Sequence, residues 1–437
     1  MRPIAILLTV LALCCPACGD DDGAADSSVV DAAQGVDAAW DDSTVPADAD
    51  TTDAGQPGDC PAADLGVRLG RDRLLIGGSM SDTAFGGAPF DIRYHYVAGN
   101  VPESGPCDSC ATGCSVQGTS CAGGACPWWG CWQWDQLPPG RFVADFVSGT
   151  HAAGAVPMIT YYIWYSVAGD VEGAPEIAAL TDGARVTAFL ADFRFLCQTM
   201  NEPPAPTAVL HVEPDLWGYG HQVNDDPEQI PVSLAAAGAS ECASYPDTLG
   251  GLTRCLVAIA RAEAPNVLVG LHASAWGAGA DALNNSDPGF DATTHAQATA
   301  AYLIALGAAD TDLVVVEMSD RDAGFNGRWW DVTNATLPSF RQAVDWVADL
   351  GDALSLAPLW WQVPYGHMAL EDQCDRYTDN RVDYIFDHAD EIAAGGAIGV
   401  AFGAGASCMT TPDTDDGHFV QRAADYFQNA RPPLCGQ

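Results

Sequence analysis

Lysine is absent from this sequence, in which all seventeen basic residues are arginines. No lysine amine is therefore present to form a Schiff base, to anchor pyridoxal phosphate or to bind phosphate in a P-loop. Positive charge is scarce in general, because fifty-eight acidic residues against seventeen basic ones give a formal net charge of −41. Such a charge argues against nucleic acid as a partner and against electrostatic attraction to anionic lipid.

Three sequence patterns are also missing. There is no G-x-S-x-G, so the nucleophile elbow of the α/β-hydrolases is not indicated. There is no H-E-x-x-H or comparable metal-ligand spacing. No internal repeat of short period is visible, which argues against a solenoid or a propeller. What is present is a chain of 437 residues, 48% of them hydrophobic. After the first sixty or so, this is enough for one barrel-sized domain of roughly 250–400 residues.

The N-terminus has the pattern of an export signal. The apolar run Ile4–Leu13 is too short to span a bilayer. A small residue before Cys18, with Gly and Asp after it, resembles a bacterial lipoprotein signal in which Cys18 becomes the lipidated first residue. We expect residues 1–17 to be a signal peptide and residues 18–65 a disordered acidic linker, which cannot bury enough apolar surface to offset its ordering entropy. The protein is thus expected in the cell envelope, either lipid-anchored or exposed at the surface and extracellular.

Cysteine usage agrees with export. Sixteen cysteines, less the two in the signal and Cys18, leave thirteen. In an exported chain their density indicates disulfides, although the C-x-x-C of Cys107 and Cys110 leaves a structural zinc site open. Six of them fall in one loop: Cys107, Cys110, Cys114, Cys121, Cys126 and Cys131.

The remaining cysteines suggest particular pairs. Cys374 and Cys408 lie in successive late loops and could be bridged, as could Cys242 and Cys255. Because thirteen is odd, one thiol is expected to be free. Cys197, on an apolar helix face, is the candidate.

Apolar segments of strand length alternate with helical patterns after the linker. Alternation predicts a parallel sheet, and eight strands predict its closure, so the fold class is α/β, a (β/α)₈ TIM-type barrel over residues 66–437. The expected strands are Leu74–Gly77, Phe90–Val97, Val156–Trp164, Ala208–Glu213, Val267–Ala273, Leu313–Glu317, Leu354–Gln362 and Ile398–Phe402. The expected helices are Arg141–Ser148, Arg185–Met200, Leu249–Ala264, His295–Leu306, Pro338–Leu350, Tyr384–Ala394 and Phe419–Asn429.

A long connection interrupts this alternation. Residues 99–139, between the second and third strands, are rich in Cys and Trp. A loop of this length in a compact domain is usually a lid or a binding element.

The stretch His211–Gly220, reading HVEPDLWGYG, closes the fourth expected strand. Alternation along a strand places His211 and Glu213 on one face. The carboxyl ends of barrel strands carry the chemistry of such enzymes. Glu213, Glu317 and Asp320 therefore become the candidate catalytic residues.

Paired carboxylates among aromatic rings are what glycoside hydrolysis requires. Glu213 is the expected general acid, because partial desolvation beneath Trp217 would raise its pKa. Glu317 is expected to act as nucleophile or base. Asp320 and Asp322 compete with it, although their spacing around Arg321 leaves an internal ion pair or a calcium site open.

Other residues at strand ends are expected to bind the substrate, with Trp217 as a platform for a sugar ring. A Trp at a strand end is also commonly part of the core, so a structural role stays open for each. His211 and His272 could form half a metal site with Glu213, but no motif supports it, and neither a metal nor another cofactor is expected. The expected binding residues are Asp215, Trp217, Tyr94, Tyr162, Trp164, His272, Trp276, Trp361 and Gln362.

Two local resemblances support a barrel of the TIM-type glycoside hydrolase superfamily. Glu213–Asp215, the later Cys242 and the helix leading to Pro265–Val267 resemble the corresponding region of family 6 glycoside hydrolases, the cellulases. That family's Asp-Arg-Asp-Cys segment is not found on the third strand, which reads ITYYIWY. The resemblance therefore implies a fold and a reaction class and assigns no residue roles.

The C-terminal part resembles a group of uncharacterised exported bacterial barrel proteins, through Ser319–Gly324, Trp360–Pro364 and Asp379–Tyr384. Together these features predict an exported monomeric glycoside hydrolase that acts on a polysaccharide or oligosaccharide and contacts the membrane only through its lipid anchor. The alternatives are a non-catalytic carbohydrate-binding surface lipoprotein and a metal-dependent hydrolase.

Overall fold

The computed structural model describes the folded part of the chain. The predicted signal, the lipidation site Cys18 and the cysteines of the long loop lie outside the described residues. The structure describes residues 60–99, 101, 115–116, 119–120, 132–134, 136 and 138–436.

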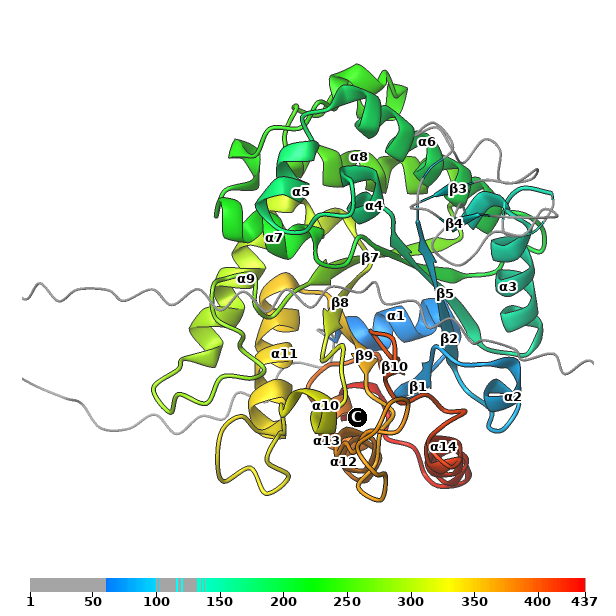
Figure 1. Cartoon of the computed structure of the whole chain (residues 1–437), viewed down its shortest axis with the longest axis vertical. Coiled ribbons are helices and arrows are strands. Elements are labelled where there is room, and N and C mark those ends of the chain that lie inside the picture. The colour runs from blue at the N-terminus through cyan, green and yellow to red at the C-terminus, as the bar shows by residue number, and fades with distance from the viewer. Residues whose placement is uncertain are drawn as a thin grey trace, which may run out of the picture. The chain divides into compact units, whose positions relative to one another are not determined.

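Eight parallel strands close into a barrel, in the order β1-β10-β9-β8-β7-β6-β5-β2 (Figure 1). This confirms the predicted (β/α)₈ fold. Most of the strands are hydrophobic over nearly their whole length, as expected where both faces of a parallel sheet are covered, whereas β2 also contains Arg93 and His95. They are β1 Leu75–Gly78, β2 Ile92–Ala98, β5 Val156–Tyr162, β6 Ala208–Val212, β7 Val267–Ala273, β8 Leu313–Glu317, β9 Ala357–Val363 and β10 Gly399–Phe402. The long connection holds a separate two-stranded sheet, β3 Ser115–Val116 with β4 Thr119–Ser120.

The interior of the barrel is packed with side chains. Met158, Val209, Leu268, Val315 and Trp361, from five different strands, belong to one buried cluster. Such layers of alternating inward side chains fill TIM barrels. Any site must therefore lie at the mouth, above these layers.

Helices surround the barrel (Figure 1). Every predicted helix is present, but Tyr384–Ala394 is divided into α12 and α13 because the backbone leaves the helical conformation at His388. The helices are α2 Asp82–Phe85, α3 Arg141–Ala152, α4 Trp164–Ala168, α5 Ala174–Ala179, α6 Gly183–Met200, α7 Leu216–Val223, α8 Leu249–Glu263, α9 Ala292–Leu306, α10 Ala323–Asn326, α11 Phe340–Leu354, α12 Arg381–Asp387, α13 Ala389–Ala394 and α14 His418–Gln428.

The four longest helices begin at capping residues. The side chains of Asp182, Thr248, Asp291 and Ser339 accept hydrogen bonds from backbone N–H groups in the first turns of α6, α8, α9 and α11. Each such cap stabilises its helix by about 1 kcal/mol. The helix expected from Pro338 therefore begins only after Ser339.

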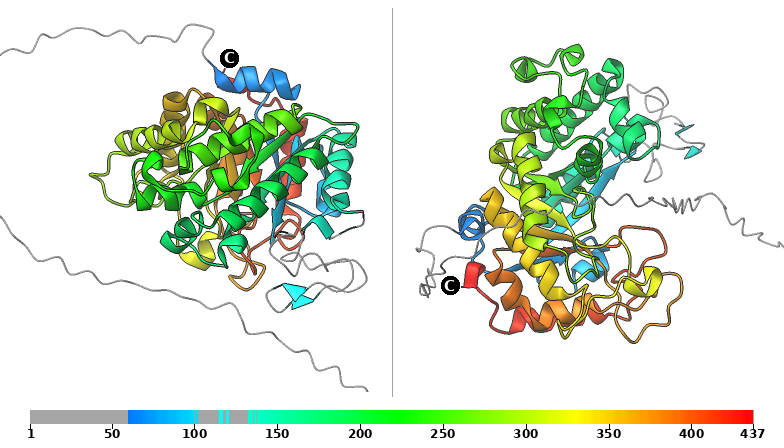
Figure 2. Two further views of the ribbon diagram at one scale, coloured as in Figure 1. Left: turned by 90° about the horizontal axis from the view of Figure 1, so that it is seen from above. Right: turned by 90° about the vertical axis from the view of Figure 1, so that its left-hand side faces the viewer.

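Six further helices were not predicted: the short helices α2, α4, α5, α7 and α10, and α1 (Pro61–Leu69) at the start of the domain. The most informative of them is α1. It begins before residue 66, where the sequence placed the start of the domain. Its Leu65 joins the cluster that fills the barrel, which explains why these residues are ordered rather than part of the linker. A disulfide links Cys60, the N-cap of α1, to Cys435, so α1 and the C-terminus lie side by side (Figure 2).

The other cysteines that the structure describes follow the predicted pattern. Disulfides join Cys242 to Cys255 and Cys374 to Cys408, and Cys197 is free and fully buried. In the part of the chain that the structure describes, we found no helix both long and apolar enough to cross a bilayer.

Candidate active site

Three residues at strand ends have unusual backbone conformations. Glu213 and Asp215, after β6, have φ values of +46° and +72°, and Gln362, in β9, has φ +58°. Residues other than glycine seldom adopt this region, and such strain concentrates at functional sites. The three strained positions lie at the carboxyl ends of β6 and β9, where a barrel of this kind carries its functional residues.

Asp215 and Glu317 face each other at this mouth. One donor atom from each of Asp215, His272 and Glu317 lies within 4.8 Å of the other two. Both carboxylate residues are half-buried, whereas His272 is fully buried. The sequence predicted Glu317 as catalytic and assigned Asp215 and His272 to substrate binding. The structure brings these three together.

The two carboxyl groups perturb each other's protonation. Burial, followed by the charges of Glu172 and Asp320, raises the pKa of Asp215 to about 7. Burial, with Asp215 and Asp320, holds the pKa of Glu317 well above its ordinary value, while a hydrogen bond from the Trp276 indole opposes this rise. Like charges this close do not both ionise readily, so the pair retains a proton near neutral pH.

A chain of buried polar groups supports His272 from below. Its Nδ1 lies 3.0 Å from Nε2 of His211, and Nδ1 of His211 lies 3.2 Å from the hydroxyl of Thr160. Burial lowers the pKa of His272 to about 3 and that of His211 well below its ordinary value, so both rings are neutral. The nitrogen atoms of His211 thus contact His272 and Thr160 rather than a metal shared with Glu213. The carboxylate that lies beside His272 is Asp215, not Glu213.

Glu213 occupies a different environment from the one predicted. It is fully buried, and its Oε1 accepts hydrogen bonds from the backbone N–H groups of Ile163 and Trp164, at 3.1 and 3.0 Å. Burial raises its pKa well above the ordinary value, and the acidic groups that add to this rise are Glu176 and Asp192. The carboxyl group therefore ties the end of β6 to the start of α4, whereas the charges acting on Glu317 come from Asp215, Asp320 and Asp281.

Further acidic groups surround Asp215. Asp320 forms an ion pair with Arg321, which was one of the alternatives left open by the sequence. Glu172 accepts a hydrogen bond from the hydroxyl of Tyr219 at 3.2 Å. Glu176 is buried, and burial together with Asp215 and Glu172 raises its pKa to about 8. Sequence reasoning missed Glu172 and Glu176 because they precede and begin the short helix α5 rather than end a strand.

Partly exposed aromatic rings line the same mouth. Trp276 and Tyr219 lie with ring centroids 4.9 Å apart, and Tyr162 stacks on Tyr165 at 5.9 Å. All four are half-buried. Trp276 and Tyr162 were predicted to bind substrate, and their places beside Glu317 and Asp215 fit that role.

Four of the other predicted aromatic residues are buried, so they offer no face to a sugar. Trp217 is 1% exposed and donates its indole N–H to the carbonyl of Val212, and Trp164 is 0% exposed and donates to the carbonyl of Glu176. Trp361 and Tyr94 belong to the layers inside the barrel. The platform role expected for Trp217 is therefore wrong: this ring fills the core, as the structural alternative allowed.

Gln362 reaches the mouth through a second aromatic residue. Its side-chain amide donates a hydrogen bond to the hydroxyl of Tyr96. The charges of Glu317 and Asp215 contribute to a raised pKa of Tyr96, which places Tyr96 beside the carboxyl pair. The sequence feature that indicates a place for Tyr96 at the mouth is its position two residues after Tyr94, on the same face of the strand.

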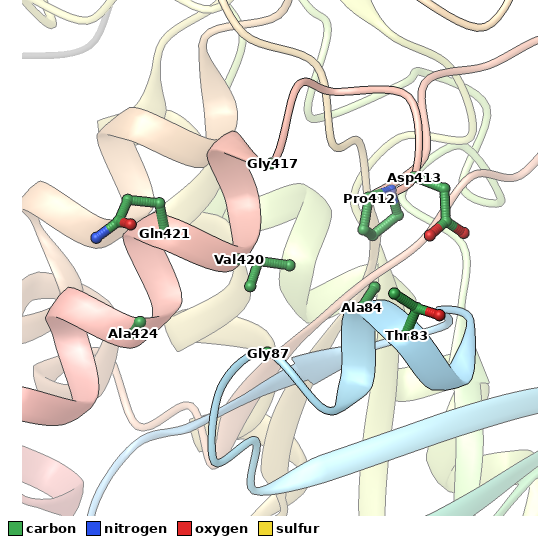
Figure 3. A pocket seen from close by; sticks show the side chains of 9 residues that line it. All are labelled: Thr83, Ala84, Gly87, Pro412, Asp413, Gly417, Val420, Gln421 and Ala424. Atoms are coloured by element: carbon green, nitrogen blue, oxygen red, sulfur yellow. The ribbon is translucent and has the colours of Figure 1, made fainter.

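A surface pocket lies apart from this cluster. It is formed between α2, α14 and the loop that precedes α14, with a volume of about 280 Å³ (Figure 3). In the close-up Val420 lies opposite Gly87, and Pro412 and Asp413 lie over Thr83. No carboxyl group of the mouth lines it, and the candidate site therefore remains at the ends of β6, β7 and β8.

Comparisons with known proteins gave structural likenesses only. Neither the models of protein families nor the curated proteins contained a match. A modular endo-β-1,4-mannanase of glycoside hydrolase family 26 from Cellulomonas fimi aligns with a TM-score of 0.45 and 13% identity, over 85% of this chain and 75% of its own. Endo-glycoceramidase II from Rhodococcus sp. aligns with a TM-score of 0.42 and 11% identity, over 81% and 79%. A mannanase from Streptomyces sp. SirexAA-E aligns with a TM-score of 0.36 and 11% identity, over 78% and 79%.

Proposed function

We propose that this protein is a glycoside hydrolase in which Asp215 and Glu317 are the catalytic pair. The observation that supports this most is their approach, together with His272, to within 4.8 Å at the carboxyl end of a closed parallel barrel. That end of the barrel is where enzymes of this fold carry their chemistry. The protonation of the pair and the aromatic rings around it fit hydrolysis of a sugar.

Asp215 takes the role of general acid. Its pKa of about 7 keeps the carboxyl group protonated up to neutral pH, as donation to a leaving glycosidic oxygen requires. Its side chain is half-buried, so it remains accessible from the mouth. The sequence assigned this role to Glu213, which is enclosed between β6 and α4.

Glu317 takes the role of nucleophile. The indole of Trp276 hydrogen-bonds to its carboxyl group and favours the ionised form. The pair shares one proton, and the reactive form is the one in which this proton is on Asp215 and Glu317 is ionised. Attack on the anomeric carbon would form a glycosyl-enzyme bond as the leaving oxygen takes the proton from Asp215. Water activated by the Asp215 carboxylate would then hydrolyse that bond.

The separation of the carboxyl groups favours retention of configuration. Retaining enzymes place the two groups about 5–5.5 Å apart, and inverting enzymes about 6.5–9.5 Å apart, to admit a water molecule. An approach within 4.8 Å agrees with the shorter spacing. We therefore propose a double-displacement reaction.

The substrate we propose is a polysaccharide or oligosaccharide, because half-buried rings such as Trp276 and Tyr162 can stack on the C–H faces of sugar units. Export and lipid anchoring through Cys18 belong to the same proposal, as does a monomeric protein. The support for export and for the anchor is the N-terminal sequence pattern.

The test is hydrolysis of a panel of neutral polysaccharides, including mannans and β-glucans, by the wild-type protein and three variants. Asp215→Asn and Glu317→Gln should each lower the rate by about 10²–10⁴-fold. Glu213→Gln keeps the oxygen that accepts the backbone hydrogen bonds, so its rate of hydrolysis should fall far less. The configuration of the first product, followed by NMR, should be that of the substrate.

The alternatives predict different results. A carbohydrate-binding protein without activity would bind a glycan in wild type and in Glu317→Gln and hydrolyse none. Loss of activity in Glu213→Gln alone would return the acid role to Glu213. Inversion at the first product would contradict the double displacement.

A further inference from the structure

We propose that Asp215, His272 and Glu317 form a binding site for one divalent transition-metal ion, and that an ion bound there inhibits hydrolysis. The metal site itself is argued from geometry and donor chemistry. Only the inhibition rests on the proposed function, because it requires that Asp215 and Glu317 are the catalytic pair.

The main observation is an imidazole nitrogen without a partner. Nε2 of His272 is buried and has no hydrogen-bond partner among the residues that the structure describes. A buried polar atom left unsatisfied costs about 1–3 kcal/mol. Its other ring nitrogen is engaged by His211, so Nε2 is the atom that His272 presents to Asp215 and Glu317. Nε2 of His272 and the two carboxylates therefore offer three ligand atoms to one cation.

The spacing of the three donors suits a small ion. Bonds of about 2.0–2.2 Å meeting at a tetrahedral angle place ligand atoms roughly 3.4 Å apart. The donor atoms of Asp215, His272 and Glu317 now lie within 4.8 Å of one another. Rotation of the two half-buried carboxylate side chains would close this difference without movement of the strands.

The groups behind His272 match the support that metal-bound histidines receive. A ligating imidazole usually donates its other N–H to an acceptor, which fixes the ring and its tautomer. Here Nδ1–H of His272 would donate to Nε2 of His211 at 3.0 Å, and Nδ1–H of His211 would donate to the hydroxyl of Thr160 at 3.2 Å. One assignment of protons therefore satisfies every contact in this chain and leaves Nε2 of His272 free for a metal.

The mixed donor set indicates which ions fit. One imidazole and two carboxylates suit Zn²⁺, which takes three protein ligands and leaves a position open, whereas Mg²⁺ and Ca²⁺ prefer oxygen alone. The second group of metal-binding residue types, at Cys374, Asp375 and Cys408, differs because its cysteines form a disulfide. Zn²⁺ is therefore the probe of choice.

Occupation of this site would block both catalytic roles. A metal bound to Glu317 uses the electron pair that would attack the anomeric carbon. A metal bound to Asp215 displaces the proton that the leaving oxygen requires. The same two carboxyl groups cannot serve the ion and the substrate at once.

The experiment is calorimetric titration of Zn²⁺ into the full chain, freed of tags and treated with chelator, in excess Mg²⁺ to suppress binding to surface carboxylates. Hydrolysis is measured in parallel with and without Zn²⁺. We expect one ion per chain. His272→Ala and Glu317→Gln should each weaken binding more than about 100-fold, and Thr160→Val about 10-fold, since loss of outer partners costs about 10–100-fold.

Glu202→Gln is the matched control for Glu317→Gln, because Glu202 is exposed and precedes β6 at the opposite end of the barrel. Thermal unfolding shows whether each variant is folded. Because Glu317→Gln preserves size and shape, it keeps the test decisive if His272→Ala fails to fold.

The outcomes separate the two proposals. Absence of stoichiometric binding, or equal binding by wild type and Glu317→Gln, overturns the metal site, while an active metal-free enzyme keeps the proposed function. Tight binding lost in the variants, with activity falling as Zn²⁺ binds, supports both. Tight binding with activity only in the presence of Zn²⁺ establishes the site and refutes both the inhibition and the metal-free carboxylate mechanism.

Discussion

Replacement of Asp215 by Asn should stabilise the folded protein at alkaline pH while it removes activity. Asp215 and Glu317 approach within 4.8 Å, and burial, followed by the charges of Glu172 and Asp320, raises the pKa of Asp215 from 3.8 to about 7. Asn is neutral at every pH, so it removes this repulsion while it keeps the size of the side chain.

The size of the effect follows from the distance. With an energy of 332/(ε·r) kcal/mol, two charges at the 4.8 Å upper limit of the separation repel by about 0.9 kcal/mol at ε of about 80 and about 3.5 kcal/mol at ε of about 20. The half-buried side chain lies between these limits, so we expect a gain of about 1–3 kcal/mol in the free energy of unfolding.

The pH at which the gain appears follows from the sign of the shift. A pKa raised in the folded state favours the protonated form, so the stability that Asp215 contributes is fully present below its unfolded pKa. That stability is lost as the pH rises through about 7. The free energy of unfolding of Asp215→Asn should thus equal that of wild type at acidic pH and exceed it above neutral pH.

Denaturant unfolding with chelator present, at about pH 5 and about pH 8, measures this difference. Asp310→Asn is the control, because Asp310 is exposed before β8 at the other end of the barrel. An advantage of Asp215→Asn that does not grow between the two pH values, or one that Asp310→Asn shares, would refute the repulsion of Asp215 by the acidic groups around it.

Three other outcomes are expected. Hydrolysis by the wild-type enzyme should fall as the pH rises through about 7, because Asp215 then loses the proton that it donates; a rate that stays level to higher pH in a pH–rate profile would contradict this. Glu213→Ala should lower the free energy of unfolding by at least about 1–3 kcal/mol, since two buried backbone N–H groups lose their acceptor, and Glu213→Gln should lose much less in the same denaturation assay. Replacement of both Cys60 and Cys435 by Ser should cost about 2–5 kcal/mol of stability, which a lowered melting temperature in scanning calorimetry would show.

The barrel could be predicted from the sequence because its signals are local. Runs such as Val267–Ala273 and Leu313–Glu317 carry the length and composition of buried strands, and capping residues such as Thr248 mark where helices begin. The pair Cys374 and Cys408 was foreseen because the loops that hold them follow successive strands. The link from Cys60 to Cys435 was not foreseen, because only the closed barrel brings the two ends of the chain together.

The residue proposed as the catalytic acid could not be predicted from the local sequence alone. Glu213 and Asp215 are two residues apart, so simple alternation assigns both to the face that carries His211. The structure separates them by positive φ values at both positions. The carboxyl group of Glu213 is held by two N–H groups at the start of α4, whereas Asp215 approaches Glu317.

Those N–H groups belong to Ile163 and Trp164, about fifty residues away in the sequence. If the backbone stayed extended past β6, Glu213 would lie on the same strand face as His211. The turn with positive φ values instead buries Glu213 against the start of α4. The proposed choice of Asp215 over Glu213 as the acid therefore depends on hydrogen bonding between neighbouring strand ends. For this reason Glu213→Gln and Asp215→Asn are the most informative pair of variants. Glu213→Gln keeps the oxygen that accepts the two backbone hydrogen bonds, whereas Asp215→Asn removes the carboxyl group that is proposed to donate the proton.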